Sequence, residues 1–261
     1  MDLATYRQTD AEQARTADIL GLVPAGGRRA LDIGARDGHF SRRLAERFDE
    51  VVALDLQAPA IQHPRIASLA GDITQLPFDD ATFDFVLCSE VLEHIPPAQL
   101  ALACREVARV ASSRVLIGVP YKQDLRIERT TCLTCGKRNP PNGHVNSFDE
   151  VRLTQLFAPW PAERSTFVGQ IDTSTNAVAA WLMDLAGNPF GVYGQDEPCI
   201  HCGAPLRHPP PRTILQRALT RTATWCAALS APFHPPHANW IHMSFRKDDG
   251  VSSSSHDRLS R

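Results

Sequence analysis

The sequence lacks two features that would point to membranes or nucleic acids, namely a long apolar run and a strong excess of one charge. No stretch approaches the ~20 consecutive apolar residues of a membrane-crossing helix, so we expect no membrane insertion. The 27 Lys and Arg residues nearly balance the 29 Asp and Glu residues, which leaves a net charge of −2. This balance provides no bulk positive field for nucleic acid or for an anionic membrane, and it argues against nucleic acid as a partner.

A secretion signal and an even set of cysteines are also missing. The first residues, Met1-Asp2-Leu3-Ala4-Thr5-Tyr6, do not show the basic and then apolar pattern of a signal peptide. The seven cysteines are an odd number, which does not suit a disulfide framework. We therefore expect a cytoplasmic protein whose cysteines are free thiols or metal ligands. The 261 residues are enough for one α/β domain with a sizeable appendage.

What the sequence does contain is a strand, a glycine turn and a helix near its N-terminus. Residues 30–33 form a short apolar run interrupted by Asp32, Gly34 and Gly38 bracket a turn, and residues 39–48 have the amphipathic pattern of a helix. Glycine permits the sharp turn and leaves no Cβ in the way of a ligand. This arrangement is typical of the start of a nucleotide-binding βαβ unit, although glycine turns also close many α/β units that bind nothing.

Three further strands follow, and two of them lead to a carboxylate. The run at residues 51–54 leads to Asp55, a position from which an acid can accept both hydroxyls of a ribose. A third strand leads to Asp72, and a polar turn then precedes a fourth strand at residues 83–88. A plain NAD-binding fold would explain the glycine turn alone, but it does not predict the later motifs.

This ordered series resembles the class I S-adenosylmethionine-dependent methyltransferases of the type-11-like branch, which has the block Leu-Pro-Phe-Asp (residues 76–79) before Phe-Asp-x-Val (residues 83–86). The resemblance extends over residues 15–120. It implies that Gly34 and Gly38 line the methionine part of the cofactor. Asp55 would hold the ribose, and Asp72 with Ile73 would meet the adenine. The implied set of cofactor-binding residues is Asp32, Gly34, Ala35, Arg36, Gly38, Asp55, Leu56, Asp72, Ile73 and Cys88.

One position departs from the family pattern, because the turn often has the form Gly-x-Gly-x-Gly and Arg36 stands at the middle glycine. Asp32 and Asp84 have an alternative role, since acids at such positions also bind neighbouring loops. In the family a helix before the first strand covers the cofactor, and Tyr6 either joins this cover or is a surface aromatic. Residues 10–22 fit that helix, with apolar positions at Ala14, Ala17, Ile19, Leu20 and Leu22.

The later segments complete an α/β fold. Residues 98–111 have helical spacing of apolar side chains that include Cys104, and residues 115–120 form a fifth apolar strand. This alternation predicts a doubly wound, mostly parallel sheet with all strand C-termini along one edge. The resemblance implies a seven-stranded Rossmann-like sheet that ends in an antiparallel pair, for which residues 164–170 and 239–246 are suitable strands.

The domain organisation follows from where this alternation stops. Between the last two expected strands lie far too many residues for a hairpin loop, and helical patterns occur there at residues 177–185 and 213–229. The expected parts are a cofactor-binding half (1–127), a first zinc-knuckle loop (128–146), a helix and strand completing the sheet (147–171), an insertion that covers the substrate (172–237), a final strand (238–247) and a disordered tail (248–261).

Two Cys-x-x-Cys-Gly motifs lie beyond the resemblance, one with Cys132 and Cys135 and the other with Cys199 and Cys202. Four thiolates in such turns match the tetrahedral coordination of zinc, and they leave no open position for catalysis. A shared structural zinc would hold the loop after the fifth strand against the insertion. Redox dithiols or two unrelated loops are the alternatives. Cys226, like Cys88, has no such partner in the sequence and is expected in the core or a loop.

The residues just after the fourth strand form a second polar group, with Glu90, Glu93 and His94 followed much later by His144. In the resembled family the acceptor lies beside this strand end. A metal-dependent subset, which includes small-RNA 2′-O-methyltransferases and some quinone-pathway O-methyltransferases, has a similar Glu-x-x-Glu-His and a later histidine that hold a divalent ion. These four residues are our candidate catalytic set, with Mg²⁺ or Mn²⁺ as an optional cofactor. A metal-free general base and purely structural roles are the alternatives.

We therefore expect a methyltransferase that uses S-adenosylmethionine and contains structural zinc. Its expected acceptor is a hydroxyl of a small molecule or a glycan, with a histidine such as His94 or His144 accepting the proton. Two alternatives remain open: an RNA 2′-O-methyltransferase, which the balanced charge disfavours, and a non-catalytic zinc-containing scaffold of the same fold.

Overall fold

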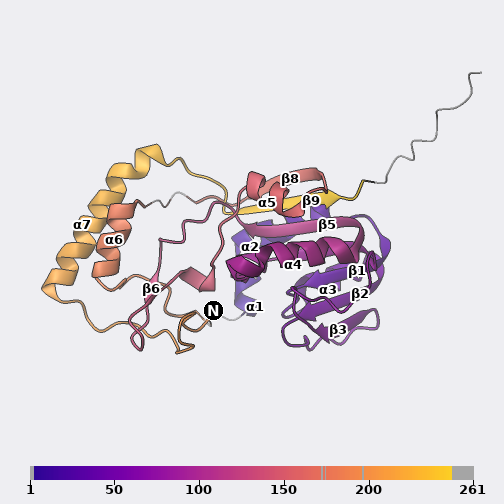
Figure 1. The fold of residues 1–261 in the computed structure, drawn as a ribbon, viewed down its shortest axis with the longest axis horizontal. Coiled ribbons are helices and arrows are strands. Elements are labelled where there is room, and N and C mark those ends of the chain that lie inside the picture. The colour runs from indigo at the N-terminus through magenta and orange to yellow at the C-terminus, as the bar shows by residue number, and fades with distance from the viewer. Residues whose placement is uncertain (1–2, 172, 174, 196, 249–261) are drawn as a thin grey trace, which may run out of the picture.

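The protein is built on one seven-stranded sheet with a separate insertion beside it, as the computed structural model in Figure 1 shows. The structure describes residues 3–171, 173, 175–195 and 197–248. Of the predicted tail (248–261), residues 249–261 lie outside the described residues. Among the described residues, no helix combines the length and the apolar character needed to cross a bilayer.

The sheet has the strand order β3-β2-β1-β4-β5-β9-β8. Strands β3, β2, β1, β4 and β5 are parallel, and β9 pairs antiparallel with both β5 and β8. The strands of this sheet are β1 (Gly27–Ile33), β2 (Phe48–Asp55), β3 (Ile66–Ala70), β4 (Phe83–Ser89), β5 (Ala111–Pro120), β8 (Ala162–Val168) and β9 (Trp240–Arg246). This topology confirms the predicted doubly wound, mostly parallel seven-stranded sheet.

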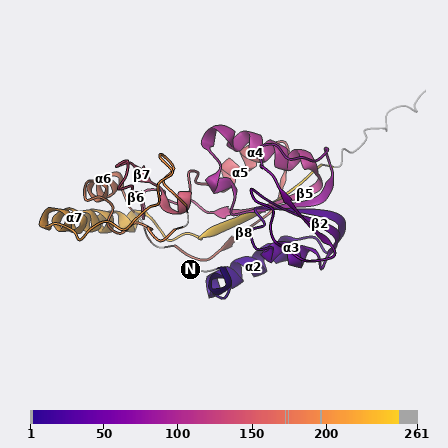
Figure 2. The ribbon, with the colours of Figure 1, turned by 90° about the horizontal axis from the view of Figure 1, so that it is seen from below.

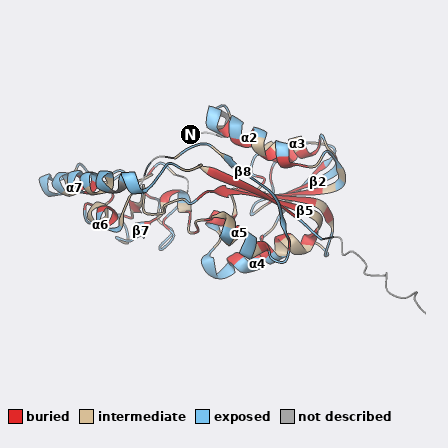
Figure 3. Cartoon of the chain, turned by 90° about the horizontal axis from the view of Figure 1, so that it is seen from above, coloured by how far each residue is buried: buried red, intermediate tan, exposed pale blue. Residues whose placement is uncertain are grey.

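Helices cover both faces of the sheet, as the edge-on view in Figure 3 shows. Each face has its own apolar core, because successive side chains of a strand point to opposite sides. Leu31 and Ile33 of β1 belong to one core cluster and Ala30 belongs to the other. The helices over the first face are α4 (Pro97–Val110) and α5 (Glu150–Phe157), and those over the second are α2 (Asp10–Leu22) and α3 (His39–Leu44). A short helix, α1 (Leu3–Tyr6), precedes α2.

Two details of the predicted helices were wrong. The helix expected over residues 39–48 ends at Leu44, and Phe48 instead begins β2, where its ring stacks on Phe85 at 5.7 Å. The predicted apolar face of α2 was wrong in part, because Ala14 and Ala17 are exposed while Ile19 and Leu22 are buried as expected. The buried face of α2 contains polar as well as apolar side chains, namely Glu12, Arg15, Thr16, Ile19 and Leu22.

An insertion made of two segments, the loop after β5 and the segment between β8 and β9, extends away from the sheet, as Figures 1 and 2 show from two directions. It contains the two-stranded sheet of β6 (Thr130–Thr131) and β7 (Arg138–Asn139) and the helix pair α6 (Ala177–Leu185) and α7 (Ile214–Ser230). The helices agree with the segments predicted at residues 177–185 and 213–229. Thr213 caps α7 with its side chain in a capping box with Gln216, which explains why the helix begins there.

Candidate functional site

A cavity of about 560 Å³ opens where β1 and β4 end. Parallel strands place their carboxyl ends at one edge of the sheet, which is where ligands bind in open α/β folds. The walls come from the segment α1–α2, the turn after β1, the loop after β4, the start of β9 and the insertion. The residues that line the cavity include Tyr6, Arg7, Arg15, Asp32, Gly34, Arg36, Ser89, Glu90, His94, Gln123, Asn142, His144, Gln195, Glu197 and Trp240.

The glycine turn after β1 forms one end of this cavity. Gly34 and Gly38 have positive φ values of 78° and 77°, which glycine adopts without strain. Arg36 also has a positive φ, 44°, and its backbone N–H donates to the Asp55 carboxylate at 2.9 Å. The turn therefore keeps a left-handed residue at the position where the family pattern often has its middle glycine, and the acid at the end of β2 supports that conformation.

Gly34→Ala is expected to destabilise the protein, whereas Gly21→Ala is expected to leave stability unchanged or raised. A Cβ on Gly34 would lie 2.3 Å from Cγ2 of Val91 and would be held at a positive φ, but a Cβ on Gly21 would meet nothing within 4 Å. The backbone strain alone costs on the order of 1–3 kcal/mol. Urea unfolding of both variants measures the difference, and equal midpoints would contradict the proposed close packing of the turn.

The predicted cofactor residues lie at the cavity, near two neighbouring strand ends, or in the core. Asp32 lies buried at the cavity, where it accepts a hydrogen bond from Ser41 Oγ at 2.5 Å, and burial raises its pKa to about 7. Asp55 and Asp72 lie on neighbouring strand ends, where each carboxylate also accepts backbone N–H groups, from Leu56 and Thr74 respectively. The remaining predicted residues are Ala35 (buried, lining the cavity), Leu56 (exposed), Ile73 (buried) and Cys88 (buried in the core).

Asp84, by contrast, binds backbone at the other end of its strand. Its carboxylate accepts the N–H groups of Arg28 and Arg29 at 2.6 and 3.0 Å, at the start of β1. This is the loop-binding role that was left open for it in the sequence.

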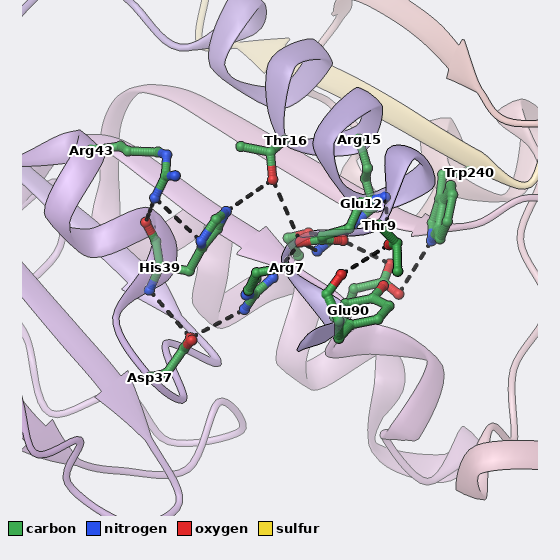
Figure 4. Close-up of polar contacts among 12 residues, drawn as sticks. Arg7, Thr9, Glu12, Arg15, Thr16, Asp37, His39, Arg43, Glu90 and Trp240 are labelled. Atoms are coloured by element: carbon green, nitrogen blue, oxygen red, sulfur yellow. Dashed lines mark hydrogen bonds and ion pairs between the residues drawn. The ribbon is translucent and has the colours of Figure 1, made fainter. Parts of the chain in front are cut away.

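A polar network over the cavity was missed by the sequence reasoning, and Figure 4 shows it. The buried Arg15 guanidinium of α2 donates to Glu12 and to Ser89 Oγ, the latter at 2.9 Å, and lies against the Trp240 ring. Arg7 binds Glu12 and also Asp37 in the glycine turn, the latter at 3.1 Å. The segment α1–α2 is thus joined to the turn that it covers. The sequence feature that could have revealed this network is the charged pair Glu12 and Arg15, which lies on the same helical face as Ile19.

His94 and His144 line the other side of the cavity, and Glu93, another predicted acceptor-site residue, lies buried beside them. The His94 and His144 rings meet edge to face with centroids 4.7 Å apart. One potential ligand atom each from Glu93, His94 and His144 lies within 4.8 Å of the others. Glu90 does not belong to this group, because its carboxylate contacts Trp240 Nε1 at 3.3 Å and lies 3.9 Å from the Arg15 guanidinium. Glu90 therefore faces the polar network of α2, although it lines the same cavity as His144.

Asn146 explains how residues so far apart in sequence meet. Its side-chain amide donates to the carbonyls of Leu92 and Ile95 at 3.0 and 2.6 Å. The backbone N–H of Val145 donates to the Glu93 carbonyl at 2.7 Å. The loop bearing His144 is thus hydrogen-bonded to the short helix that bears Glu93 and His94.

The charges in this group are unusual for a protein interior. Glu93 is fully buried, and neither of its carboxylate oxygens has a hydrogen-bond partner among the described residues. Burial raises the pKa of Glu93 well above its usual range. Burial and the neighbouring His94 lower the pKa of His144 to about 3, so its ring is neutral. His144 Nδ1 lies 2.7 Å from Gln123 Oε1, and donation to this oxygen leaves a lone pair on Nε2. An unpaired carboxylate beside neutral imidazoles is a donor set that suits a divalent cation or a proton transfer.

The four predicted cysteines meet in the insertion. The Sγ atoms of Cys132 and Cys202 are 3.7 Å apart, and those of Cys135 and Cys199 are 3.6 Å apart. Four ligands at the usual Zn–S distance of ~2.3 Å in a tetrahedron would lie about 3.8 Å from one another. The spacing of the thiols thus fits one zinc ion.

The two cysteine turns also have the same local structure. Gly136 and Gly203, which follow each motif, both have a φ of 70°, and their N–H groups donate to Cys132 and Cys199 carbonyls at 2.8 Å. The N–H of Cys135 lowers the pKa of the Cys132 thiol to about 6, which favours the thiolate that a metal requires. Among the other cysteines, Cys88 and Cys104 are buried in the core and Cys226 is half-buried on α7.

The second cysteine turn lies close to the cavity wall. Asn142 N donates to Gln195 Oε1 at 2.8 Å, and a Cβ on Gly143 would approach Glu197. Asn142, Gln195 and Glu197 all line the cavity. The segment before Cys199 therefore contacts the loop that bears His144.

Comparison with known proteins agrees with this geometry. Residues 31–117 match the family described as a methyltransferase domain. An uncharacterized methyltransferase of Mycobacterium tuberculosis is 38% identical over 94 residues, 34% of this chain and 37% of that protein. A demethylmenaquinone methyltransferase of Renibacterium salmoninarum is 37% identical over 114 residues, 42% of this chain and 46% of that protein. The chain thus matches less than half the length of these relatives.

A solved structure extends the likeness over nearly the whole chain. The 1,6-didemethyltoxoflavin-N1-methyltransferase of Burkholderia thailandensis, with bound 1,6-didemethyltoxoflavin and S-adenosylhomocysteine, superposes with a TM-score of 0.53. The match covers 94% of this chain and 84% of that one at 17% sequence identity, which bears on the fold alone. This chain therefore has the Rossmann-like methyltransferase fold, and its residues 31–117 match the methyltransferase-domain family.

Proposed function

We propose that this protein transfers a methyl group from S-adenosylmethionine to a hydroxyl of a small-molecule or glycan acceptor. The main observation in support is that one cavity joins the glycine turn at Gly34 to the side chains of His94 and His144. Bound S-adenosylmethionine would supply an already activated methyl group, so catalysis consists chiefly of holding acceptor, methyl and leaving sulfur in line. The acceptors in the names of the demethylmenaquinone and didemethyltoxoflavin methyltransferases support a small-molecule acceptor.

The residues present fit the cofactor. Gly34 lines the cavity where the methionine part would lie, and the Asp55 carboxylate at the end of β2 would bind the ribose hydroxyls. The buried Arg15 guanidinium faces the cavity beside Ser89 and can bind the carboxylate of the methionine part. Asp32, with its pKa near 7, would be ionised by the positive charge of the ligand's ammonium group.

On the acceptor side, His94 and His144 would bind the substrate hydroxyl and take its proton, with the buried Glu93 beside them. Nε2 of His144 can accept the proton; Glu93 can do so only once a bound cation has ionised its carboxyl, because burial alone keeps that group neutral. The two unpartnered oxygens of Glu93 also fit a bound Mg²⁺ or Mn²⁺, which would lower the pKa of the hydroxyl. Only Glu93, His94 and His144 of the predicted set would hold that ion, because Glu90 faces Arg15 and Trp240 instead.

We further propose that Cys132, Cys135, Cys199 and Cys202 bind one structural zinc ion. The thiol spacing supports this assignment, and four thiolates leave the metal no position for a substrate. The role of the zinc would be to hold the loop bearing His144 and the segment bearing Gln195 and Glu197 in the cavity wall.

Calorimetric titration with S-adenosylhomocysteine tests the proposed function. The wild type is expected to bind, and Asp55→Ala is expected to bind at least tenfold more weakly because two hydrogen bonds to the ribose, of ~1–3 kcal/mol each, are lost. Asp49→Ala removes an exposed acid from the start of the same strand and is the matched control, with unchanged affinity. Absence of binding by the wild type would refute the proposal.

The two alternative functions, a scaffold and an RNA methyltransferase, predict different results in binding and methylation assays of the purified protein. A non-catalytic scaffold would bind S-adenosylhomocysteine and yield no methylated product on a broad acceptor panel. An RNA 2′-O-methyltransferase would label RNA rather than small hydroxylated compounds when supplied with radioactive S-adenosylmethionine. Methylation of a small-molecule or glycan hydroxyl supports the proposal over both.

A further inference from the structure

The helix pair α6–α7 exposes an unusual amount of apolar surface. It projects from the rest of the molecule, and its outer side is almost entirely exposed in Figure 3. Trp181 is 55% exposed, Trp225 is 61% exposed and Leu229 is 77% exposed. Single exposed apolar side chains are ordinary on protein surfaces, but grouped ones mark interaction sites.

The exposed apolar side chains of α7 are grouped by the helix period. The side of α7 that is turned inward contains Thr220 and Ala223, which are buried. At 3.6 residues per turn, the opposite side contains Ile214, Trp225 and Leu229, all exposed. The helix is therefore amphipathic, but its large apolar stripe faces solvent and small residues such as Thr220 and Ala223 face inward.

Basic side chains border this stripe. By the same helical spacing, Arg217 and Arg221 lie along one flank of the outward face, and both are exposed. The Arg221 guanidinium lies over the Trp225 ring, 5.3 Å from its centroid. An apolar stripe with an adjacent row of arginines and a tryptophan is typical of helices that lie in the interface of a bilayer.

Helix α6 has an exposed apolar stripe of its own, on the side turned away from α7. Val178, Trp181 and Leu185 are exposed and follow one another at helical spacing. The acid of this helix, Asp184, is buried and forms ion pairs with Arg129 at 3.2 Å and Arg138 at 2.9 Å. It therefore contributes little negative charge to the outer surface.

The local charge of this region differs from that of the whole chain. The sequence from residue 198 to residue 247 contains no Asp or Glu. Its Lys and Arg residues are Arg207, Arg212, Arg217, Arg221, Arg246 and Lys247. The whole chain has a net charge of −2, but this segment, which contains α7, carries only positive side-chain charges.

We propose that helix α7 docks on an anionic lipid surface, with its apolar stripe in the headgroup region and its arginines on the lipid phosphates. The positive charge beside the apolar stripe of α7 favours a lipid surface over a second copy of the chain. A symmetric contact with a second copy of the chain would place the arginines of both copies together, where they repel. An anionic surface attracts the same arginines and accommodates tryptophan at the headgroup level. The proposal concerns binding at a surface and does not depend on the methyl transfer.

Vesicle flotation of the full chain tests this docking. The wild type is expected to float with vesicles of phosphatidylcholine mixed with phosphatidylglycerol and to remain behind with pure phosphatidylcholine vesicles. The double variant Arg217→Gln/Arg221→Gln is expected to bind anionic vesicles at least tenfold more weakly, since each basic residue near such a surface contributes to binding. Arg42→Gln/Arg105→Gln removes the same charge from exposed positions on α3 and α4 and should retain binding.

A second variant separates the apolar contribution from the charge. Trp225→Ser/Leu229→Ser should also weaken flotation at least tenfold, while its circular dichroism and S-adenosylhomocysteine affinity match those of the wild type. Three results would overturn the proposal: no flotation of the wild type with anionic vesicles, equal flotation of all variants, or a dimer in light scattering that Trp225→Ser/Leu229→Ser dissociates. The last result would identify a second copy as the occupant.

Discussion

Replacement of Cys132 or Cys199 with serine is expected to remove zinc from the protein and to loosen its whole insertion. Elemental analysis should find about one zinc per chain in the wild type and much less in either variant. The physical reason is that the four-thiol site brings together two segments far apart in sequence, so metal binding supplies folding energy. Structural zinc contributes ~10–16 kcal/mol in zinc-finger peptides, far more than the small apolar cluster around Tyr193 and Leu206 can replace.

Hydrogen–deuterium exchange locates the expected change. Exchange should accelerate in residues 128–146 and 191–206 and remain slow in β1 and β4, whose cores do not involve the insertion. Cys226→Ser, a change at a half-buried thiol of α7, is the control and should retain both zinc and slow exchange. Rapid alkylation of all four cysteines in fresh wild-type protein would contradict the zinc assignment.

The second large effect is expected at the acceptor side. Glu93→Gln and His144→Ala should each lower turnover by about 10²-fold or more, which is the usual scale for a lost proton-transfer group. The affinity for S-adenosylhomocysteine should hardly change, because neither side chain lies at the glycine turn. Glu93→Gln keeps the shape of a side chain that burial already favours as neutral, so this variant should fold as the wild type does.

Turnover and binding together distinguish this role from a structural one. A loss of S-adenosylhomocysteine binding, or a lowered unfolding midpoint in Glu93→Gln, would show that the cluster supports the fold instead. His234→Ala, at an exposed histidine of the insertion, is the matched control and should keep full turnover. Loss of activity on chelation and its return with Mg²⁺, while zinc remains bound, would select the metal-assisted reaction over the metal-free base.

The sequence by itself determined the elements whose structure depends only on residues close together in the chain. Apolar runs such as residues 51–54 form buried strands because a parallel sheet covered on both faces requires apolar side chains on both sides. The glycine turn was visible because Gly34 and Gly38 supply backbone conformations that other residues avoid. The cysteine set could be predicted because each Cys-x-x-Cys-Gly motif forms its half of the site within one turn.

Only the tertiary structure decided which polar side chains meet. Glu12 and Arg15 were missed because they lie on the buried face of α2, where the apolar periodicity fails, and their mutual ion pair permits their burial. Glu93, His94 and His144 meet through the hydrogen bonds of Asn146, a link between segments that no local pattern predicts. Glu90, adjacent in sequence, is turned to Arg15 and Trp240 instead.

The surface of the insertion illustrates the same division. The helical patterns at residues 177–185 and 213–229 predicted α6 and α7, but an apolar stripe in a sequence is ordinarily assigned to a core. In the structure Trp225 and Leu229 face solvent, because the two helices pack on each other through small residues such as Ala179 and Ala223. Periodicity determines that a helix has an apolar side, and the packing of the whole chain determines whether that side is covered.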